Sequence, residues 1–475
     1  MKLRSQLFFI LFVFFAAAFF ISCEPNPTGP VTNANTTNTA VNTTVNTNQP
    51  ANTSPPVARN EENMAANLPV TLAVLDAMFA DETFAGELKT KLNLSDEQIA
   101  KLKDEARNDT LALSESDDAA GSTSSATRRA QEKIQGIVGA DKAREISALV
   151  RERWSGGAAP ADFMTKANSV PGDTRIVVNA PAFRMDIFKD GQLVRTYKVG
   201  IGYPEFPLPV GLRQAKEIIF NPTWTPPDEP WVKGKVKPGQ KVEAGSKLNP
   251  LGPIKIPIGL PSLIHGGKSA DRLGQFASHG CVGLTSPQVQ DFALALAQIS
   301  GTELTDADVS TFEKAKTETK NVKLQQNIPV ELRYETIVVE DGKLKIFRDV
   351  YERGTNTEEN LRRVLEAHGV SIDSLSEAER NSALQALKQM AVDAGGAPVT
   401  PADSNQTAAN SNQNQTGQNK NTNSQQSGKV TRNIKGQKEI VIEIAALNGK
   451  GYPAPVDYNT GAKSKKPLSS QGNKQ

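Results

Sequence analysis

Hydrophobic residues recur at helical spacing in two parts of this chain, and they alternate with polar residues in the part between. From about Leu68 to Trp154, apolar side chains return every three or four positions, and Ser95-Asp96-Glu97-Gln98 has the spacing of a helix capping box. This part is expected to be helical, with one of its helices spanning 127–154. A second helical segment is expected at 355–395, where Thr357 would cap the first helix.

Between these helical parts, short runs alternate hydrophobic and polar residues, as strands do. Arg175–Asn179 and Met185–Phe188 are expected strands, and Lys189-Asp190-Gly191-Gln192 is expected to form the turn of a hairpin. A later hairpin is expected to turn at Asp341-Gly342. The other elements expected here are strands at 328–339 and 344–347 and a helix at about 286–299. Mostly antiparallel strands with many Gly and Pro turns indicate a compact β-sandwich or barrel.

Two segments have no hydrophobic pattern. The first, 23–67, is rich in Asn, Thr and Pro, and the second, 396–435, is rich in Asn, Gln and Ser. Neither can bury a core, so both are expected to be disordered linkers. Within 436–475, the run from Lys438 to Ala446 alternates like a single strand, which needs a partner to be stable. The expected ordered regions are 68–156, 173–353 and 355–395.

The N-terminus has the layout of a secretory signal peptide. A basic start is followed by a continuous apolar stretch from Leu7 to Ile21, then Ser22 and Cys23. A cysteine at that place resembles a bacterial lipobox, in which the cysteine is lipidated after residues 1–22 are removed. We therefore expect a lipid-anchored protein on the periplasmic side of a bacterial cell envelope, at the outer membrane if the cell has one. Ordinary secretion and an uncleaved anchor are the alternatives.

The overall charge indicates no nucleic-acid partner. Lys plus Arg number 54 against 52 for Asp plus Glu, so no strong global field surrounds the chain. The chain has only two cysteines and three histidines, and one cysteine and two histidines lie within one short window. The residues of this window are therefore the first candidates for a reactive site.

Cys281 lies in the run Ser278-His279-Gly280-Cys281-Val282, and His265-Gly266-Gly267 begins sixteen residues upstream. A thiol needs a neighbouring imidazole to act as a nucleophile near neutral pH, and a turn rich in backbone N–H groups can stabilise the oxyanion that its attack creates. The window contains all three ingredients. It is interpreted as a cysteine acyl-transfer site.

Several separated motifs resemble the L,D-transpeptidase catalytic domain of the YkuD-like family. Besides the thiol window, they are the Asp190-Gly191 hairpin, Pro207-Leu208-Pro209-Val210-Gly211, Asn221-Pro222-Thr223-Trp224, and Gly245 with Asn249-Pro250-Leu251-Gly252. The resemblance covers about 175–353. Many members place Arg two residues after the cysteine, where this chain has Gly283. The resemblance implies a mainly β catalytic domain at 173–353, a YkuD-like β-sandwich with a helix after the cysteine.

The resemblance also implies a mechanism and roles. Cys281 would attack the tetrapeptide stem of peptidoglycan, expel the terminal D-alanine and pass the thioester-bound peptide to an amine on a second stem. His265 would be the base, with its imidazole oriented by the Gly266 carbonyl. The N–H groups of His279, Gly280 and Cys281 would form the oxyanion hole. Ser278, Gly283 and Trp224 are candidates for substrate binding, although Trp224 could instead pack the sheet.

Other functions remain open at this point. Water as the acceptor would give an L,D-carboxypeptidase, a protein amine would give an enzyme that attaches proteins to peptidoglycan, and a degenerate fold would give a non-enzymatic lipid-anchored tether. A zinc site using Asp271, a Cys23–Cys281 disulfide and a buried structural cysteine are further uses of these residues. No cofactor or metal is expected. The helical regions are candidates for binding an envelope protein partner.

Overall fold

The computed structural model describes residues 68–116, 122–154, 168–225, 241–259, 262–399 and 429–461. Several of the expectations above fall outside these residues: the signal peptide 1–22, Cys23, the linker 23–67, most of the linker 396–435 and the last residues of the tail. The domain boundaries therefore stay predictions. Among the helices of these ranges, none combines the length and the apolar character that crossing a membrane requires.

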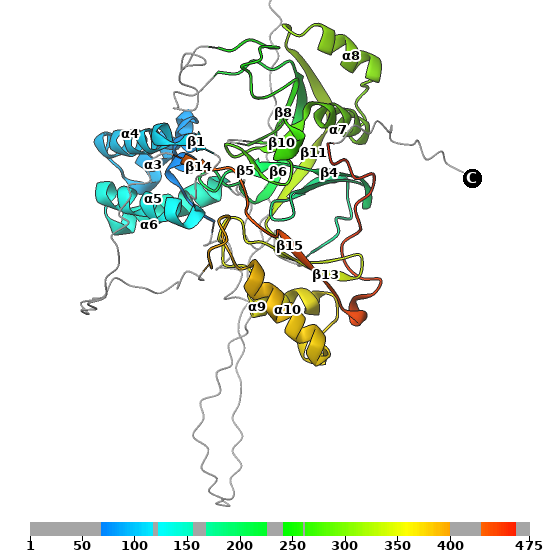
Figure 1. Cartoon of the computed structure of the whole chain (residues 1–475). Helices are drawn as coiled ribbons and strands as arrows, with labels where there is room; N and C mark the ends of the chain where they lie inside the picture. The colour runs from blue at the N-terminus through cyan, green and yellow to red at the C-terminus, as the bar shows by residue number, and fades with distance from the viewer. Residues whose placement is uncertain are drawn as a thin grey trace, which may run out of the picture. The chain divides into compact units, whose positions relative to one another are not determined.

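The N-terminal described part is a bundle of helices with a hydrophobic core of its own (Figure 1). The helices are α2 (Leu72–Phe79), α3 (Glu82–Leu92), α4 (Asp96–Ala112), α5 (Thr123–Val138) and α6 (Ala140–Trp154). The capping box expected at Ser95 and Gln98 is present at the start of α4. The single helix expected over 127–154 is wrong, because Gly139 has a φ of 86° and separates α5 from α6.

The central part is an eight-stranded, mixed sheet in the order β10-β8-β7-β6-β11-β2-β3-β4. Its strands are β2 (Arg175–Asn179), β3 (Arg184–Lys189), β4 (Gln192–Lys198), β6 (Gly211–Phe220), β7 (Ile254–Pro257), β8 (Leu263–Lys268), β10 (Val282–Thr285) and β11 (Lys320–Arg333). Two short strands, β5 (Ile201–Gly202) and β9 (Phe276–Ser278), pair separately. Within the eight-stranded sheet, the pairs β10–β8 and β11–β2 are parallel and the other pairs are antiparallel. The mainly β fold predicted for this region is confirmed.

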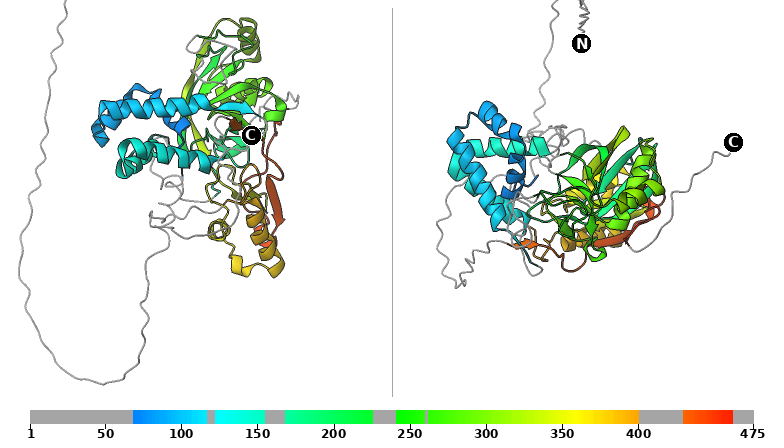
Figure 2. Two further views of the ribbon diagram at one scale, coloured as in Figure 1. Left: turned by 60° about the vertical axis from the view of Figure 1, so that its left-hand side comes forward. Right: turned by 90° about the horizontal axis from the view of Figure 1, so that it is seen from above.

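Helix α7 (Ser286–Ile299) follows β10 directly and packs against β7, β8 and β10. Figure 2 gives two further views of the green part of the chain to which these elements belong. Its bounds match the predicted helix, because Thr285 caps it and Pro287 occupies its first turn. Eight of its side chains are buried, including Val289 and Phe292. The helix thus packs on β8, which carries His265, and on β10, which follows Cys281. Helix α8 (Asp306–Lys314) follows.

A second, three-stranded sheet joins distant parts of the chain. It has the order β12-β13-β15, from β12 (Ile337–Glu340), β13 (Lys343–Phe347) and β15 (Glu439–Glu443). The expected strand at 328–339 is therefore divided, since β11 ends at Arg333 and β12 belongs to the other sheet. Helices α9 (Glu358–Ala367) and α10 (Glu377–Met390) pack on this sheet, and Thr357 caps α9 as predicted. The strand expected after the second linker is β15, and it pairs with β13.

The remaining short elements connect these parts. They are β1 (Ser114–Ser116), its parallel partner β14 (Lys429–Thr431), and three short 3₁₀ helices at Ala270–Arg272, Ile372–Ser374 and Ala445–Leu447.

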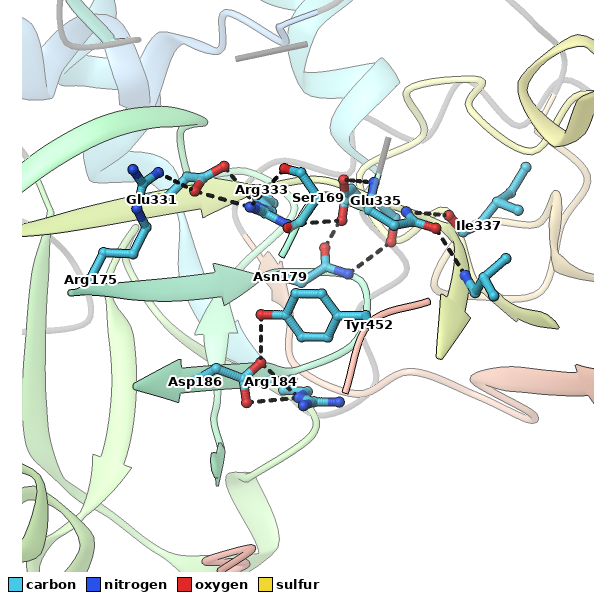
Figure 3. A network of polar contacts seen from close by, with 12 residues as sticks. Ser169, Arg175, Asn179, Arg184, Asp186, Glu331, Arg333, Glu335, Ile337 and Tyr452 are labelled. Atoms are coloured by element: carbon cyan, nitrogen blue, oxygen red, sulfur yellow. Dashed lines mark hydrogen bonds and ion pairs between the residues drawn. The ribbon is translucent and has the colours of Figure 1, made fainter. Parts of the chain in front are cut away.

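A buried ionic network joins the large sheet to the C-terminal segment (Figure 3). The Tyr452 hydroxyl donates to Asp186 at 3.1 Å, and Asp186 accepts from Arg184 Nε at 2.9 Å. On β11, Arg333 pairs with Glu331 at 2.8 Å. Arg184, Asp186, Arg333 and Tyr452 line a small pocket together with Glu335 and Glu340, and its charged side chains are engaged in ion pairs with one another. We assign it a structural role.

Candidate active site

The parallel pairing of β8 with β10 brings His265 and Cys281 onto neighbouring segments. His265 lies in β8, and Cys281 is the residue immediately before β10. The two strands are parallel, with Val282 opposite Ile264 and Gly283 opposite His265. Residues paired across two strands lie on the same face, so Gly283 shares a face of the sheet with His265. Cys281 precedes β10 by one residue and therefore lies next to the strand that pairs with β8.

The His265 imidazole is held in one orientation by its own turn. The side chain is 3% exposed, and its Nδ1 lies 2.8 Å from the Gly266 carbonyl oxygen. A carbonyl can only accept, so Nδ1 carries the proton and Nε2 is left with the lone pair. Burial and the charge of Lys268 lower the pKa of His265 to about 3, against the Gly266 and Leu251 carbonyls, which raise it. The imidazole is neutral at neutral pH.

The Cys281 thiol is also uncharged at rest. Desolvation of the sulfur raises its pKa above the ordinary value of 9.0, although the residue is only half-buried; a hydrogen bond with the Leu263 backbone and the charge of Lys268 act in the opposite direction. The turn around it is closed by Ser278, whose Oγ accepts from the Cys281 N–H at 3.0 Å and donates to the Cys281 carbonyl at 2.5 Å. The site therefore combines a neutral thiol with a neutral imidazole.

Gly280 allows the sharp turn before the thiol. Its φ is 85°, a conformation that side chains with a Cβ adopt at a cost. An added Cβ would meet no atom closer than 3.8 Å, so the backbone conformation is the constraint and not the available space. The Gly280 carbonyl is fixed by the Ser262 hydroxyl, which donates to it at 2.9 Å.

His279 is held between two aromatic rings. The centroids of Tyr203 and Phe206 lie 5.0 and 4.7 Å from its own, both in edge-to-face arrangements. Burial, together with the charges of Lys268 and Arg432, lowers the pKa of His279 to about 3. This packing suits a residue that shapes the turn.

Lys268 is the site residue that sequence analysis missed. Its side chain crosses Gly283, because a Cβ built on that glycine would lie 2.9 Å from Lys268 Cγ and 3.2 Å from Cε. Its positive charge acts on His265, His279 and Cys281. A cation from β8 thus covers the position where many family members carry an arginine. The only sequence signal was the coincidence of a lysine in β8 and a glycine in β10.

Most of the predicted site residues lie on adjoining elements, and the substrate contact predicted for Trp224 stays a prediction. His265, Gly266, Ser278, His279, Gly280, Cys281 and Gly283 all lie on β8, β9, β10 and the turn between β9 and β10. Trp224 instead forms a backbone bridge with Val242, with N···O distances of 2.9 and 2.7 Å. Ser278 is 3% exposed and its hydroxyl is engaged by the turn. Its predicted contact with substrate stays a prediction.

The metal alternative finds no ligand set in the described ranges. Among those residues, no group of three or more His, Cys, Asp and Glu side chains is placed to hold a metal ion. Asp271 hydrogen-bonds with Ser269, which lowers the pKa of its carboxyl group.

Comparison with known proteins finds one family for this region. Residues 173–304 match the family model described as YkuD, the L,D-transpeptidase catalytic domain. A curated relative, the "Putative L,D-transpeptidase YqjB" of Bacillus subtilis (strain 168), is 26% identical over 170 residues, which are 34% of this chain and 89% of that protein.

Solved L,D-transpeptidase structures are also similar to this chain, at low scores. A mutant of the Enterococcus faecium L,D-transpeptidase is 15% identical, with 34% of this chain and 50% of that one covered and a TM-score of 0.21. The catalytic domain of the E. faecium enzyme is 17% identical, and the match covers 35% of this chain and 100% of that one, with a TM-score of 0.22. The chain thus spans about half the length of the first of these proteins. At such scores the structural likeness carries no argument.

Proposed function

Since residues 173–304 form a YkuD-family L,D-transpeptidase catalytic domain, we propose that this protein uses Cys281 as a nucleophile to form or remodel peptidoglycan crosslinks. The donor would be a tetrapeptide stem, and the acceptor an amine on a second stem. The single observation that carries the assignment of residues is the orientation of His265, whose Nδ1 is bound to the Gly266 carbonyl, on the strand that pairs with β10 directly after Cys281.

In the proposed acylation step, His265 acts as a general base. Its Nε2 takes the thiol proton as Cys281 sulfur attacks the stem carbonyl, because neither group is charged beforehand. The tetrahedral intermediate collapses with cleavage of the C–N bond to the terminal D-alanine. The His265 proton passes to the departing amine, and a thioester remains on Cys281.

In the proposed second step, the acceptor amine attacks the thioester. His265 takes a proton from that amine, the new amide bond forms, and the Cys281 sulfur leaves and regains its proton. Attack by water in place of the amine would release the free peptide acid, which is the carboxypeptidase outcome. Attack by an amine on a protein would attach that protein to peptidoglycan.

The oxyanion would be stabilised by backbone N–H groups of the turn, each contributing about 3 kcal/mol in the transition state. The candidates are His279, Gly280 and Cys281. The Cys281 N–H already donates to Ser278 Oγ at 3.0 Å, so it would have to share that proton or leave Ser278. Gly280 is therefore the donor we favour.

The test is intact-mass spectrometry of the protein incubated with meropenem, beside Cys281→Ala and His265→Gln. We expect one stoichiometric adduct on the wild type, no adduct on Cys281→Ala, and a much slower reaction in His265→Gln. A folded wild type that gains no adduct would reject the nucleophile and favour a cell-wall tether. If the adduct forms, muropeptide products with an amine or only water as acceptor separate the transpeptidase from the carboxypeptidase.

We also propose that Cys23 carries a lipid that anchors the protein to a membrane of the bacterial envelope. The support is the N-terminal sequence alone. Labelling with a fatty-acid probe should mark the wild type and not Cys23→Ser, and equal labelling of both would contradict the proposal.

A further inference from the structure

The loop of residues 203–206, between β5 and β6, packs directly on the turn that presents Cys281. The Tyr203 N–H donates to the Ser278 carbonyl at 2.8 Å, and the rings of Tyr203 and Phe206 flank His279. Just before the loop, a Cβ on Gly202 would lie 2.1 Å from the Phe206 carbonyl oxygen and 3.1 Å from Gly280 Cα. A shift of this loop would therefore move the turn with it.

Two helix starts from the N-terminal bundle hold this loop. Thr71, the N-cap of α2, donates its hydroxyl to the Glu205 carbonyl at 2.8 Å and accepts from the Val74 N–H at 3.1 Å. Thr123, the first residue of α5, donates its hydroxyl to the Pro204 carbonyl at 2.8 Å. Both threonines are 1% exposed. Consecutive carbonyls of the loop are thus bound by two different helices.

A carboxylate also binds the first residues of α5. Glu352 accepts from the backbone N–H groups of Thr123 at 2.9 Å and Ser124 at 3.3 Å. A negative group at a helix N-terminus is stabilised by the unsatisfied N–H groups there. The preceding residue, Tyr351, donates its hydroxyl to the Gly202 carbonyl at 2.8 Å. Neighbouring residues Tyr351 and Glu352 thus bind both the residue before the loop, Gly202, and the start of the helix that holds the loop, α5.

We propose that the helical bundle 68–154 is a positioning element for the thiol site, acting through Thr71, Thr123 and the loop 203–206. The two threonines are positioning residues, since they touch neither the thiol nor His265. The proposal rests on the proposed acyl transfer at Cys281. It assigns the bundle a role inside the molecule, while binding of an envelope partner through the bundle is the competing outcome.

The reason to expect an effect on rate is geometric. Backbone donors stabilise an oxyanion only when they are within hydrogen-bonding distance of where its charge develops, and a misplacement of about 1 Å can cost 100-fold. Thr→Val keeps the shape of the side chain and removes its hydroxyl, which leaves a buried loop carbonyl without its donor. The loop is then expected to shift so that this carbonyl can accept a hydrogen bond from another donor.

The experiment compares full-length Thr71→Val and Thr123→Val with the corresponding Thr→Ser variants. Thr→Ser retains the hydroxyl, and Thr357→Val is the matched control, since Thr357 also caps a helix but does not bind the loop. The readouts are the rate of acylation by meropenem and the rate of alkylation of Cys281 by iodoacetamide. Alkylation needs an accessible thiol but no oxyanion hole.

We expect acylation to fall at least tenfold in each Thr→Val variant while alkylation changes less than twofold, with rates near wild type in the Thr→Ser and Thr357→Val variants. Acylation at the wild-type rate in both Thr→Val variants would overturn the proposal and favour the partner-binding role. A fall in acylation together with a change in alkylation would also overturn it, because a parallel fall means that the thiol itself has become less reactive, and a rise in alkylation means that unfolding has exposed the thiol. If Thr123→Val does not fold, Thr71→Val decides. A wild type that meropenem does not acylate rejects the proposed function instead.

Discussion

The neutral state of His265 makes the sheet that carries it sensitive to acid. Its pKa is about 3 in the fold and 6.5 in an unfolded chain, so the unfolded chain takes up the proton first as the pH falls. The stability that this difference contributes is complete above pH 6.5 and is lost as the pH falls toward 3. Between pH 7 and pH 5, one such imidazole removes about 2 kcal/mol.

His279 acts in the same direction, because its pKa is also about 3 in the fold. Together the two histidines should remove up to about 4 kcal/mol between pH 7 and pH 5. The measurement is hydrogen exchange of amides in β8 and β10, corrected for the intrinsic pH dependence of exchange, which reports the free energy of opening of that sheet. Local exchange avoids the assumption that a chain with several cores unfolds in one step.

Substitution separates the two histidines from all other titrating groups. His265→Gln should reduce the pH-dependent loss by about 2 kcal/mol, and His265→Gln with His279→Gln should nearly abolish it. The measured quantity is the difference in the free energy of opening between the two pH values, so any constant cost of each substitution cancels. A wild-type sheet equally stable at pH 7 and pH 5, or a loss that the double variant retains, would refute this prediction.

Two further predictions concern the thiol turn. Lys268→Met should raise the pH at which Cys281 becomes reactive toward iodoacetamide, because the lysine charge lowers the thiol pKa, and Lys268→Arg should leave that pH near the wild-type value. An unchanged pH profile for Lys268→Met would contradict this. Gly280→Ala forces a Cβ into a φ of 85°, which costs roughly 1–3 kcal/mol, and should slow meropenem acylation at least tenfold. Gly369→Ala, with a φ of 69° and open space around it, should cost stability without slowing acylation, and equal acylation rates in the two variants would contradict the role of Gly280.

The sequence located the thiol site because the relevant signals are local. Cys281, His279 and Gly280 are adjacent in the chain, and the capping residue of α7 follows four positions after the thiol. Such short-range patterns can be recognised without knowledge of the fold. The Met185–Phe188 strand and the turn that follows it were also predicted, since alternation and the Asp190-Gly191 turn are properties of neighbouring residues.

The missed features depend on pairing between distant segments. Lys268 reaches Gly283 only through the parallel register of β8 with β10. The strand β15 joins β13 across almost a hundred residues, and no local pattern specifies that partner. Gly139 was overlooked for a different reason: apolar positions continue at helical spacing on both of its sides, so periodicity alone joins two helices into one.

Burial of the site explains both its resting state and its need for a precise turn. Removing water from Cys281 and His265 disfavours every charged form, so neither the thiolate nor the imidazolium accumulates before substrate binds. The thiolate is the form that oxidants attack, and a thiol that stays protonated is protected from them. The same burial means that charge appears only during the reaction. Donors for the oxyanion must then already be in place, which is why we expect loop 203–206 and its two threonines to affect the rate of acylation more than the reactivity of the thiol itself.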